Sequence, residues 1–205
     1  MKKTMILSIT LLFMFHSTGF AGTPHQIGEF VLGKHISDYK KMVKMESTIP
    51  IRHQEYLHEL ETRKLEGFKS GYILIGNCSE PGRIVRIKLK YFDSTKKFYN
   101  LLLKRFKEKF GEPSEWRGDP FHVVIAWKWS FIDKEGNHIS LILQHNTKDQ
   151  EEKMGNSVKL TTTNMIEEER LCYEKKFAGS RQHKRMQPHE AKNKAPANWD
   201  LFIPR

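Results

Sequence analysis

The sequence predicts an α+β fold in which an antiparallel sheet, of about five to six strands in two meanders, carries its helices on one face. Two observations favour this class. Apolar and polar residues alternate with a period of two over several short segments, as in half-buried strands. Between these runs of strands, residues 94–110 repeat apolar side chains every four positions, as in an amphipathic helix. The order of elements would also fit a duplicated helix-plus-meander unit.

The first part of the chain is predicted to form a short helix followed by strands. Residues 37–44 have a helical pattern, which an Ile-Pro-Ile sequence ends. Residues 55–64 fit either a helix or a strand, and the meander that follows favours the strand. Residues 68–78 form the next predicted strand, and the pair Pro81-Gly82 marks the turn after it.

Residues 83–91 alternate more clearly than the preceding segments and predict a half-buried strand. Its apolar face would consist of Val85, Ile87, Leu89 and Tyr91. Its charged face would consist of Arg86, Lys88 and Lys90. The main helix is expected to begin at Asp93 or Ser94. It would end at Phe110, because Gly111 suits the residue after a helix and a proline follows two positions later.

The second half of the chain predicts three strands and a closing helix. Residues 121–131 give the strongest strand, and residues 133–137 the hairpin that leads into the return strand. A Thr-rich strand over 158–163 and a helix over 165–176 complete the domain. The residues expected on the core face of the strongest strand are Phe121, Val123, Ile125, Trp127, Trp129 and Phe131.

One segment resembles small exported bacterial α+β proteins. The main helix ends in the sequence K-F-G-E-P at residues 109–113, and a Trp-bearing hairpin follows. Residues 94–143 are similar in this respect to the helix-plus-meander units of small outer-membrane-assembly lipoproteins and of β-lactamase-inhibitor-like proteins. The resemblance implies binding through a sheet face instead of catalysis. The chain departs from the lipoproteins because it has no lipidated Cys.

The first 21 residues predict export. Two lysines follow Met1, an apolar run covers residues 5–15, and Gly19 and Ala21 occupy the −3 and −1 positions of a cleavage site. The apolar run is about half the ~20 residues that a transmembrane helix needs. We therefore expect residues 1–21 to be a cleaved signal peptide, no transmembrane segment after cleavage, and a periplasmic or secreted protein.

The remaining chain divides into a folded body and a basic tail. We expect residues 22–178 to form a single α+β domain and residues 179–205 to be a disordered tail, because aliphatic side chains are scarce before Trp199. Of the formal net charge of +11, residues 1–21 carry +2 and residues 176–205 carry +5. The body is therefore only mildly basic, which is not by itself typical of a nucleic-acid-binding protein.

The two cysteines, Cys78 and Cys172, are predicted to form a disulfide, because exported chains with two cysteines in packed elements usually join them. The closed loop of 95 residues (172 − 78 + 1) would contribute about 4–5 kcal/mol to stability in the chain-entropy model. A redox or catalytic thiol is the alternative, but neither cysteine has a C-x-x-C partner.

The sequence holds no motif for a metal site or for a known class of enzyme. The histidines lack the H-x-x-x-H and H-E-x-x-H spacings of zinc sites, so we expect no metal and no cofactor. The nucleophile sequence G-x-S-x-G and Gly-rich phosphate loops are missing as well. Catalysis by carboxylates that only the fold brings together stays open.

Five cations are predicted to lie on the polar faces of strands: Arg86, Lys88, Lys90, Lys128 and Lys159. If the strands join one sheet, these side chains form an open basic face. Such a face would bind an anionic protein, a glycan or a lipid headgroup, whereas nucleic acid does not fit the predicted compartment. The alternative is a sheet face that is charged only for solubility.

A loop between the main helix and the strongest strand offers a second candidate site, because it combines an indole, a guanidinium and a carboxylate from Trp116, Arg117 and Asp119. The sequence thus predicts an exported, non-enzymatic binding or envelope-adaptor protein that acts through the basic face. The alternative is a small hydrolase-like periplasmic enzyme with its site at this loop. A broad exposed patch would favour the first, and a deep pocket with convergent polar groups the second.

Overall fold

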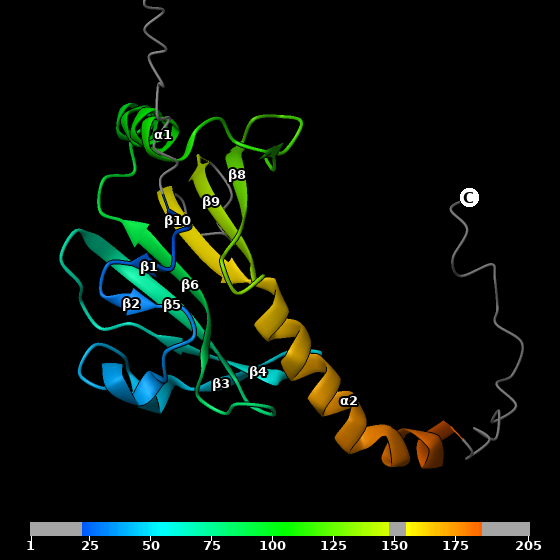
Figure 1. The fold of residues 1–205 in the computed structure, drawn as a ribbon. Helices are drawn as coiled ribbons and strands as arrows, with labels where there is room; N and C mark the ends of the chain where they lie inside the picture. The colour runs from blue at the N-terminus through cyan, green and yellow to red at the C-terminus, as the bar shows by residue number, and fades with distance from the viewer. Residues whose placement is uncertain (1–21, 148–154, 186–205) are drawn as a thin grey trace, which may run out of the picture.

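The computed structural model describes residues 22–147 and 155–185, which form an eight-stranded sheet, a two-stranded sheet and two α-helices (Figure 1). The elements are β1 (Gln26–Ile27), β2 (Phe30–Val31), the 3-10 turns η1 (Ile36–Tyr39) and η2 (Met45–Ser47), β3 (Ile49–Ile51), β4 (Gln54–Glu61), β5 (Phe68–Gly76), β6 (Ile84–Tyr91), α1 (Lys96–Phe110), β7 (Glu115–Trp116), β8 (Val124–Ile132), β9 (His138–Asn146), β10 (Gly155–Thr162) and α2 (Thr163–Arg185). The predicted α+β class is confirmed, with more strands and fewer helices than expected.

The eight-stranded sheet consists of two meanders that meet in its middle. Its strand order is β3-β4-β5-β6-β10-β9-β8-β7, and every pairing is antiparallel. Each meander has four strands, and its fourth strand pairs with the fourth strand of the other. This is the order that a repeated four-stranded unit would give. The prediction of five to six strands was wrong because edge strands β3 and β7 have only three and two residues, too few to show alternation.

The first predicted helix, over residues 37–44, is replaced by the turns η1 and η2. The N–H of Lys44 donates to the carbonyl of Glu61 at 2.8 Å, and the N–H of Arg63 donates to the carbonyl of Met42 at 2.7 Å. The N–H groups of Met42 and Val43 still donate to the carbonyl of Tyr39, but the carbonyl of Met42 and the N–H of Lys44 bond to the end of β4 and the residues after it, so the helix does not continue. A helical spacing of side chains cannot reveal this competition between partners.

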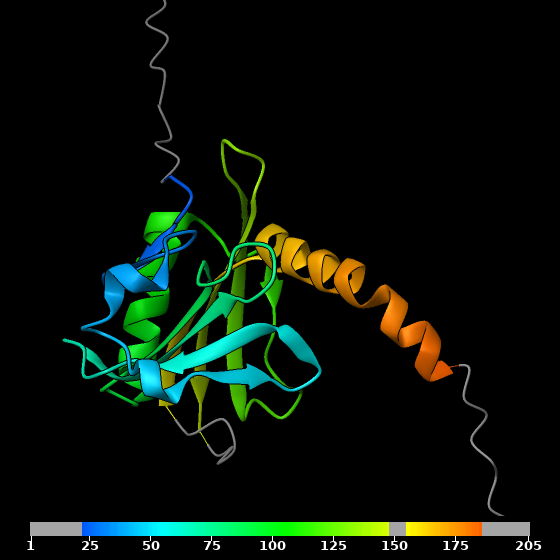
Figure 2. The ribbon, with the colours of Figure 1, turned by 90° about the horizontal axis from the view of Figure 1, so that it is seen from below.

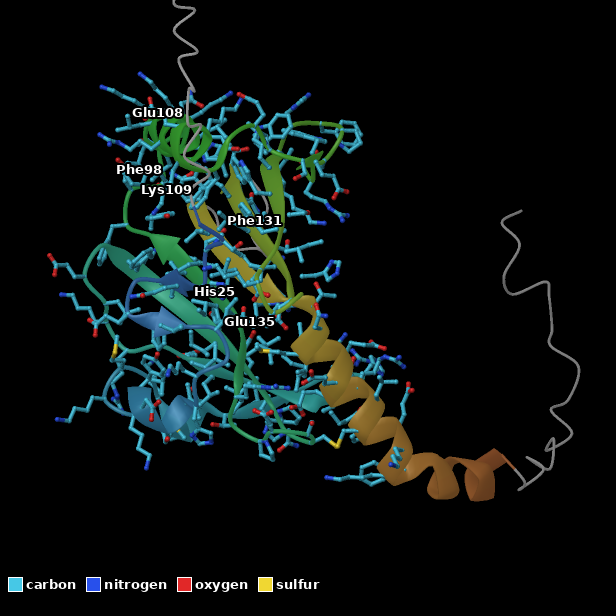
Figure 3. All side chains as sticks on the ribbon, in the orientation of Figure 1. His25, Phe98, Glu108, Lys109, Phe131 and Glu135 are labelled. Carbon is cyan, nitrogen blue, oxygen red and sulfur yellow. A yellow bond between two sulfur atoms is a disulfide. The ribbon has the colours of Figure 1, made fainter. Side chains whose placement is uncertain are left out.

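The main core lies between the sheet and a layer made of α1 and the N-terminal segment. Phe106 packs against Trp129 with ring centroids 5.7 Å apart, and Phe110 packs against Phe131 at 5.8 Å. Figure 3 labels Phe131 on the sheet and Phe98 on the helix above it. Trp129 is 1% exposed, so the predicted core role of the strongest strand is confirmed for this residue. The N-terminal strands and η1 cover the other half of the same face through buried residues such as Phe30 and Ile36.

Helix α2 covers part of the opposite face of the sheet. A second cluster there contains Leu57, Leu74 and Val85, and Met165 and Ile166 of α2 pack against it. The helices are therefore not packed on one face, which corrects the prediction. The physical reason is that the first meander is apolar on both faces at this end, so both faces need cover.

Val85 lies on the α2 side because the alternation of β6 is interrupted at its start. The pairing of β5 with β6 shifts register between Leu74 and Ile75, so that Leu74 faces Arg86 while Ile75 faces Ile84. A bulge of this kind lets two consecutive residues oppose one residue of the partner strand. The prediction that Val85 shares a face with Ile87, Leu89 and Tyr91 is thus wrong, while Ile87 and Leu89 belong to the main core.

Helix α2 begins directly after β10 and extends away from the sheet (Figures 1 and 2). It continues to Arg185, and so enters the segment 179–205 that the sequence assigned to a disordered tail. The predicted signal peptide (1–21) and residues 186–205 lie outside the described residues. No helix in the described part of the chain is long and apolar enough to cross a membrane.

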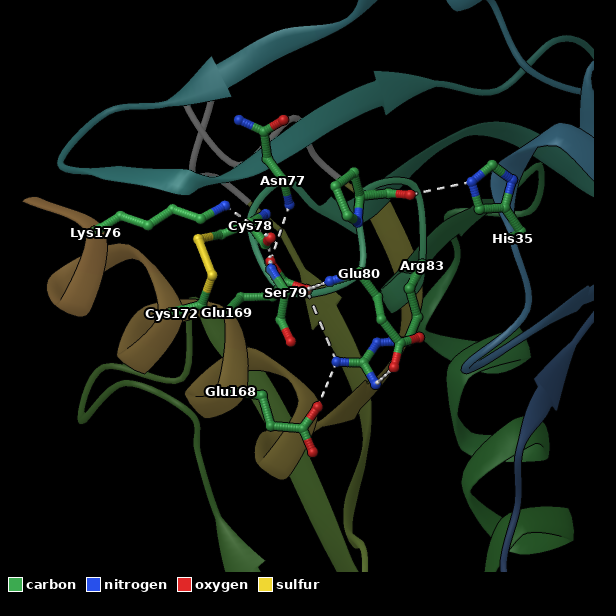
Figure 4. Close-up of polar contacts among 11 residues, drawn as sticks. His35, Asn77, Cys78, Ser79, Glu80, Arg83, Glu168, Glu169, Cys172 and Lys176 are labelled. Atoms are coloured by element: carbon green, nitrogen blue, oxygen red, sulfur yellow. Dashed lines mark hydrogen bonds and ion pairs between the residues drawn. A yellow bond between two sulfur atoms is a disulfide. The ribbon is translucent and has the colours of Figure 1, made fainter.

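The predicted disulfide is present between Cys78 and Cys172, whose Cα atoms lie 5.9 Å apart. One turn earlier in α2, the fully buried carboxylate of Glu169 accepts hydrogen bonds from the backbone N–H groups of residues 77–80 at 2.6–3.1 Å. Figure 4 shows the disulfide and the carboxylate side by side against the β5–β6 loop. A buried carboxylate thus replaces the water that these N–H groups would otherwise need.

Candidate functional site

The register of the sheet places the five predicted cations on one face. Lys88 of β6 pairs with Lys159 of β10, and Lys159 pairs with Ile142 of β9, which in turn pairs with Lys128 of β8. Cross-strand partners share a face of the sheet. Arg86 and Lys90 lie two residues to either side of Lys88 and therefore point the same way. The face opposite α1, beyond the part that α2 covers, carries all five, and we refer to these five residues as the basic face.

A shallow pocket of about 420 Å³ opens in the middle of the basic face. Its lining residues are Arg86, Arg117, Ala126, Lys128, Ser140, Ile142, Gln144, Lys159, Thr161 and Thr163. Four of these side chains are cations, and none of the described lining residues is acidic. We call this the central pocket. Lys88 and Lys90 of β6 belong to the basic face but do not line the pocket, and they pair with residues of β5.

Arg86 is a partly buried cation of the basic face. Its Nε donates to Oγ1 of Thr161 at 3.3 Å, which orients the guanidinium beside the central pocket. Burial lowers the pKa of Arg86, and the carboxylate of Glu59 acts in the opposite direction. An arginine remains charged despite such a shift. Its charge is therefore partly desolvated, and an anion that entered the pocket would stabilise it.

Glu115 lies at the edge of the central pocket and holds two of its cations in place. Its carboxylate contacts Nζ of Lys128 at 3.2 Å and Nε of Arg117 at 3.0 Å. One carboxylate therefore serves two cations. Arg117 and Lys128 together with Glu115 keep a net positive charge. Lys128 lies in β8, and Arg117 directly follows β7.

The floor of the central pocket is small and apolar, and its walls are hydroxyls and an amide. Ala126 and Ile142 form the floor, while the polar groups come from Ser140, Gln144, Thr161 and Thr163. Hydroxyl and amide groups both donate and accept hydrogen bonds. Together with four cations they can bind a hydrophilic anion, and they offer few apolar surfaces to a hydrophobic ligand.

The alternative loop site is not assembled. Trp116 pairs with Trp127, and its ring packs 4.8 Å from that indole on the core side of the sheet. Arg117 follows it in the chain and lines the central pocket on the other side. Asp119 binds its own loop, since its carboxylate accepts the N–H groups of Phe121 at 2.8 Å and of Val124. Only Arg117 joins the candidate site, and it does so with the basic face.

The same loop corrects the predicted start of the strongest strand. Because Asp119 binds the backbone of residues 121–124, these residues turn, and β8 begins at Val124 instead of residue 121. Phe121 is 86% exposed and does not reach the core face on which it was expected. The alternate residues of this segment reach the main core only from Ile125 onward.

Low pH is expected to loosen the loop that Asp119 holds. The hydrogen bond from the N–H of Val124, supported by that from Phe121, keeps the pKa of Asp119 below its usual range, although partial burial acts the other way. A depressed pKa gives stability that is present above the unfolded pKa of about 4 and is lost as the pH falls through the folded value. The protection factors of the Val124 and Phe121 amides should therefore fall in acid, as measured by hydrogen exchange.

The variant Asp119→Asn should show low protection of these two amides at neutral pH and little further change in acid. Asp133→Asn is the matched control, because Asp133 holds the 133–137 hairpin by similar bonds to the backbone. It should leave the protection of Val124 unchanged. Equal protection in the Asp119 variant and the parent chain would contradict the assigned role.

Sequence reasoning missed most of the polar lining of the central pocket. The alternation of residues 138–146 could have placed Ser140, Ile142 and Gln144 opposite the apolar positions of that strand. The place of Thr163 could not be read, because it depends on α2 beginning directly after β10. The part of Arg117 depends on the pairing of two-residue strand β7, which has no sequence signature.

The described residues include no group of three His, Cys, Asp or Glu side chains that could hold a metal ion. His138 and His145, for example, lie on opposite faces of β9, and His145 is buried, where its Nδ1 contacts Oδ1 of Asn156 at 2.7 Å. Searches of protein-family models, curated proteins and solved structures gave no match to this chain.

Proposed function

We propose that this chain is an exported, non-enzymatic binding protein whose basic face holds an anionic partner. The observation that carries the proposal is the composition of the central pocket, which has four cations and no acidic residue in its described lining. Such a pocket lowers the free energy of an anion and raises that of a cation. The open, shallow shape of the pocket suits a partner that is bound at a surface and released unchanged.

The arrangement of the cations adds support. Lys88 and Lys159 are direct cross-strand partners, so two cations lie beside each other on this face. An anion bound beside them would interact favourably with both charges.

Export is proposed from the N-terminal sequence and is supported by the disulfide. A basic start, a short apolar run and small residues at the −3 and −1 positions are typical of a cleaved signal peptide. The Cys78–Cys172 bond is of the kind that persists in an oxidising compartment such as the periplasm. In this proposal the mature protein begins at Gly22.

The double variant Arg86→Gln/Lys159→Gln is expected to lose binding of a polyanion. We expect the Kd for dextran sulfate, measured by calorimetry at 0.15 M salt, to rise about tenfold or more, since tenfold corresponds to about 1.4 kcal/mol. Protein from the periplasmic fraction should be used, and its N-terminal sequence should begin at Gly22.

The control variant is Lys96→Gln/Lys97→Gln. It removes the same charge from exposed positions of α1, on the other side of the sheet. Its Kd should change less than twofold, because general charge attraction is screened at this salt concentration. Equal losses in the two variants would mean that net charge alone attracts the polyanion, and the proposed function would fail. An N-terminus at Met1 would refute export.

A further inference from the structure

A second basic pocket lies on the same face of the sheet, towards its opposite edge. It has a volume of about 570 Å³ and is formed around the end of the β4–β5 hairpin. Its cationic lining residues are Lys44, Arg63, Lys64 and Lys69. The acidic residue in the described lining is Glu61, which pairs with Lys44 at 2.8 Å. This hairpin pocket therefore also keeps a positive charge.

The basic face connects the two pockets without a break in the register. Tyr72 and Ser70, which line the hairpin pocket, are the cross-strand partners of Lys88 and Lys90. Lys88 in turn pairs with Lys159, which lines the central pocket. Nζ of Lys90 lies 5.8 Å from the centre of the Tyr72 ring. On this face β8, β10 and β6 carry cations, while Ile142 of β9 and the polar side chains Ser70 and Tyr72 of β5 lie between these cations and the hairpin pocket. We call this row of residues, from β8 to the hairpin pocket, the basic track.

The length of this track points to a chain-like ligand. Five inter-strand spacings of about 4.8 Å separate β8 from β4, which gives about 24 Å in all. A single phosphate or carboxylate group is too small to contact both pockets. A linear polyanion laid across the strands would contact both pockets and the lysines between them.

We propose that the ligand of the basic face is a linear acidic polysaccharide that lies across the strands and occupies both pockets. This inference rests on the proposed function. The hydroxyl and amide groups of Ser140, Gln144 and Thr161 can donate to and accept from sugar hydroxyls, while the cations bind carboxylate or sulfate groups. In the hairpin pocket, Phe92 is 56% exposed and offers a flat apolar surface to a sugar ring.

Two other linear polyanions fit less well. Single-stranded nucleic acid relies on a series of aromatic side chains on which successive bases stack. The described lining of the central pocket contains no aromatic residue, and the aromatic residues Tyr72 and Phe92 are confined to the hairpin pocket. An acidic peptide that bound by adding a strand would need a free sheet edge, but the pockets lie on the face of strands that are paired on both sides. A polysaccharide needs neither an aromatic side chain for every unit nor a free sheet edge.

Binding should increase with the length of the polysaccharide. Calorimetry would compare galacturonate oligomers of two and eight sugars with inorganic phosphate, a neutral galactose octamer, an octa-glutamate peptide and an eight-nucleotide oligo-dT. We expect the octa-galacturonate to bind at least tenfold more tightly than the dimer, and more tightly than each of the other probes.

Two variants divide the track. Lys88→Gln/Lys90→Gln removes the two cations between the pockets. It should abolish most of the increase in affinity from the two-sugar to the eight-sugar oligomer, and it should leave the affinity for the two-sugar oligomer within about twofold. Arg86→Gln/Lys159→Gln should weaken both oligomers, and the Lys96→Gln/Lys97→Gln control neither. Circular dichroism would verify that each variant is folded. The charge-conserving variant Lys88→Arg/Lys90→Arg should keep the increase in affinity with oligomer length.

The outcomes separate the two proposals. If no anionic probe binds in a manner that depends on Arg86 and Lys159, the proposed function fails and this inference with it. If phosphate, the peptide or oligo-dT binds the central pocket as tightly as the octa-galacturonate, the function stands and the polysaccharide is refuted. Affinity that is equal for the dimer and the octamer would likewise overturn the track.

Discussion

Replacing Glu169 by Gln is expected to lower the free energy of unfolding by about 3–5 kcal/mol, the range measured when one partner of a buried ion pair is removed. The side chain of Glu169 is 0% exposed, and four backbone N–H groups donate to it. Nη2 of Arg83 lies 3.8 Å from the same carboxylate and balances its charge. We expect this to be the most damaging conservative substitution on α2.

The geometry explains why an amide of the same size cannot replace the carboxylate. Three of the N–H groups donate to Oε2, and the fourth, from Glu80, donates to Oε1 (Figure 4). Glutamine has one oxygen, so its NH₂ group must face at least one backbone donor. A buried donor without an acceptor costs about 1–3 kcal/mol, and the charge of Arg83 loses its buried partner as well. The site offers no room for rearrangement, because a Cβ at Gly76 would already overlap the carboxylate.

Glu168→Gln is the matched control. Glu168 precedes Glu169 in the same helix and also contacts Arg83, but its side chain is 52% exposed. Its loss should cost less than about 1 kcal/mol, as for other surface ion pairs. Urea unfolding followed by circular dichroism would measure both variants. Equal destabilisation of the two would contradict the assigned role of the buried carboxylate.

Removing the disulfide is expected to cost about 2–5 kcal/mol. Cys78 and Cys172 are separated by 94 positions in the sequence, and the bond greatly restricts the unfolded chain. Their Cα distance of 5.9 Å lies within the range of unstrained disulfides. The bond is one helical turn from Glu169, so it holds α2 to the same loop that the carboxylate binds.

The variant Cys78→Ala/Cys172→Ala would be compared with the oxidised parent by urea unfolding. Chemical reduction of the parent should give the same loss of stability. The unreduced parent, once denatured, should not react with a thiol-labelling reagent. Two reactive thiols in the unreduced chain would refute the bond. A double-mutant cycle with Glu169→Gln should show coupling, because both changes release α2 from residues 77–80.

The sequence predicted those features that depend on short-range pattern. Period-two alternation identified β6 and β9, and fourfold spacing identified α1 with its end at Phe110, because the shape of a strand or helix decides which residues share a face. The same alternation placed Arg86, Lys88, Lys90, Lys128 and Lys159 opposite the core. The strand pairing confirmed that they share one face, because residues directly opposite each other in paired strands point to the same side of the sheet.

Only the tertiary structure decided how these elements are covered and joined. A buried carboxylate such as Glu169 looks like any surface Glu in a charged helix, since its burial depends on a loop about ninety residues away. The two-residue strand β7 exists only because β8 lies beside it, and through it Arg117 enters the central pocket. Alternation fixes which side chains share a face of a strand. Long-range contacts decide which faces are covered, and these free energies arise only when distant segments meet.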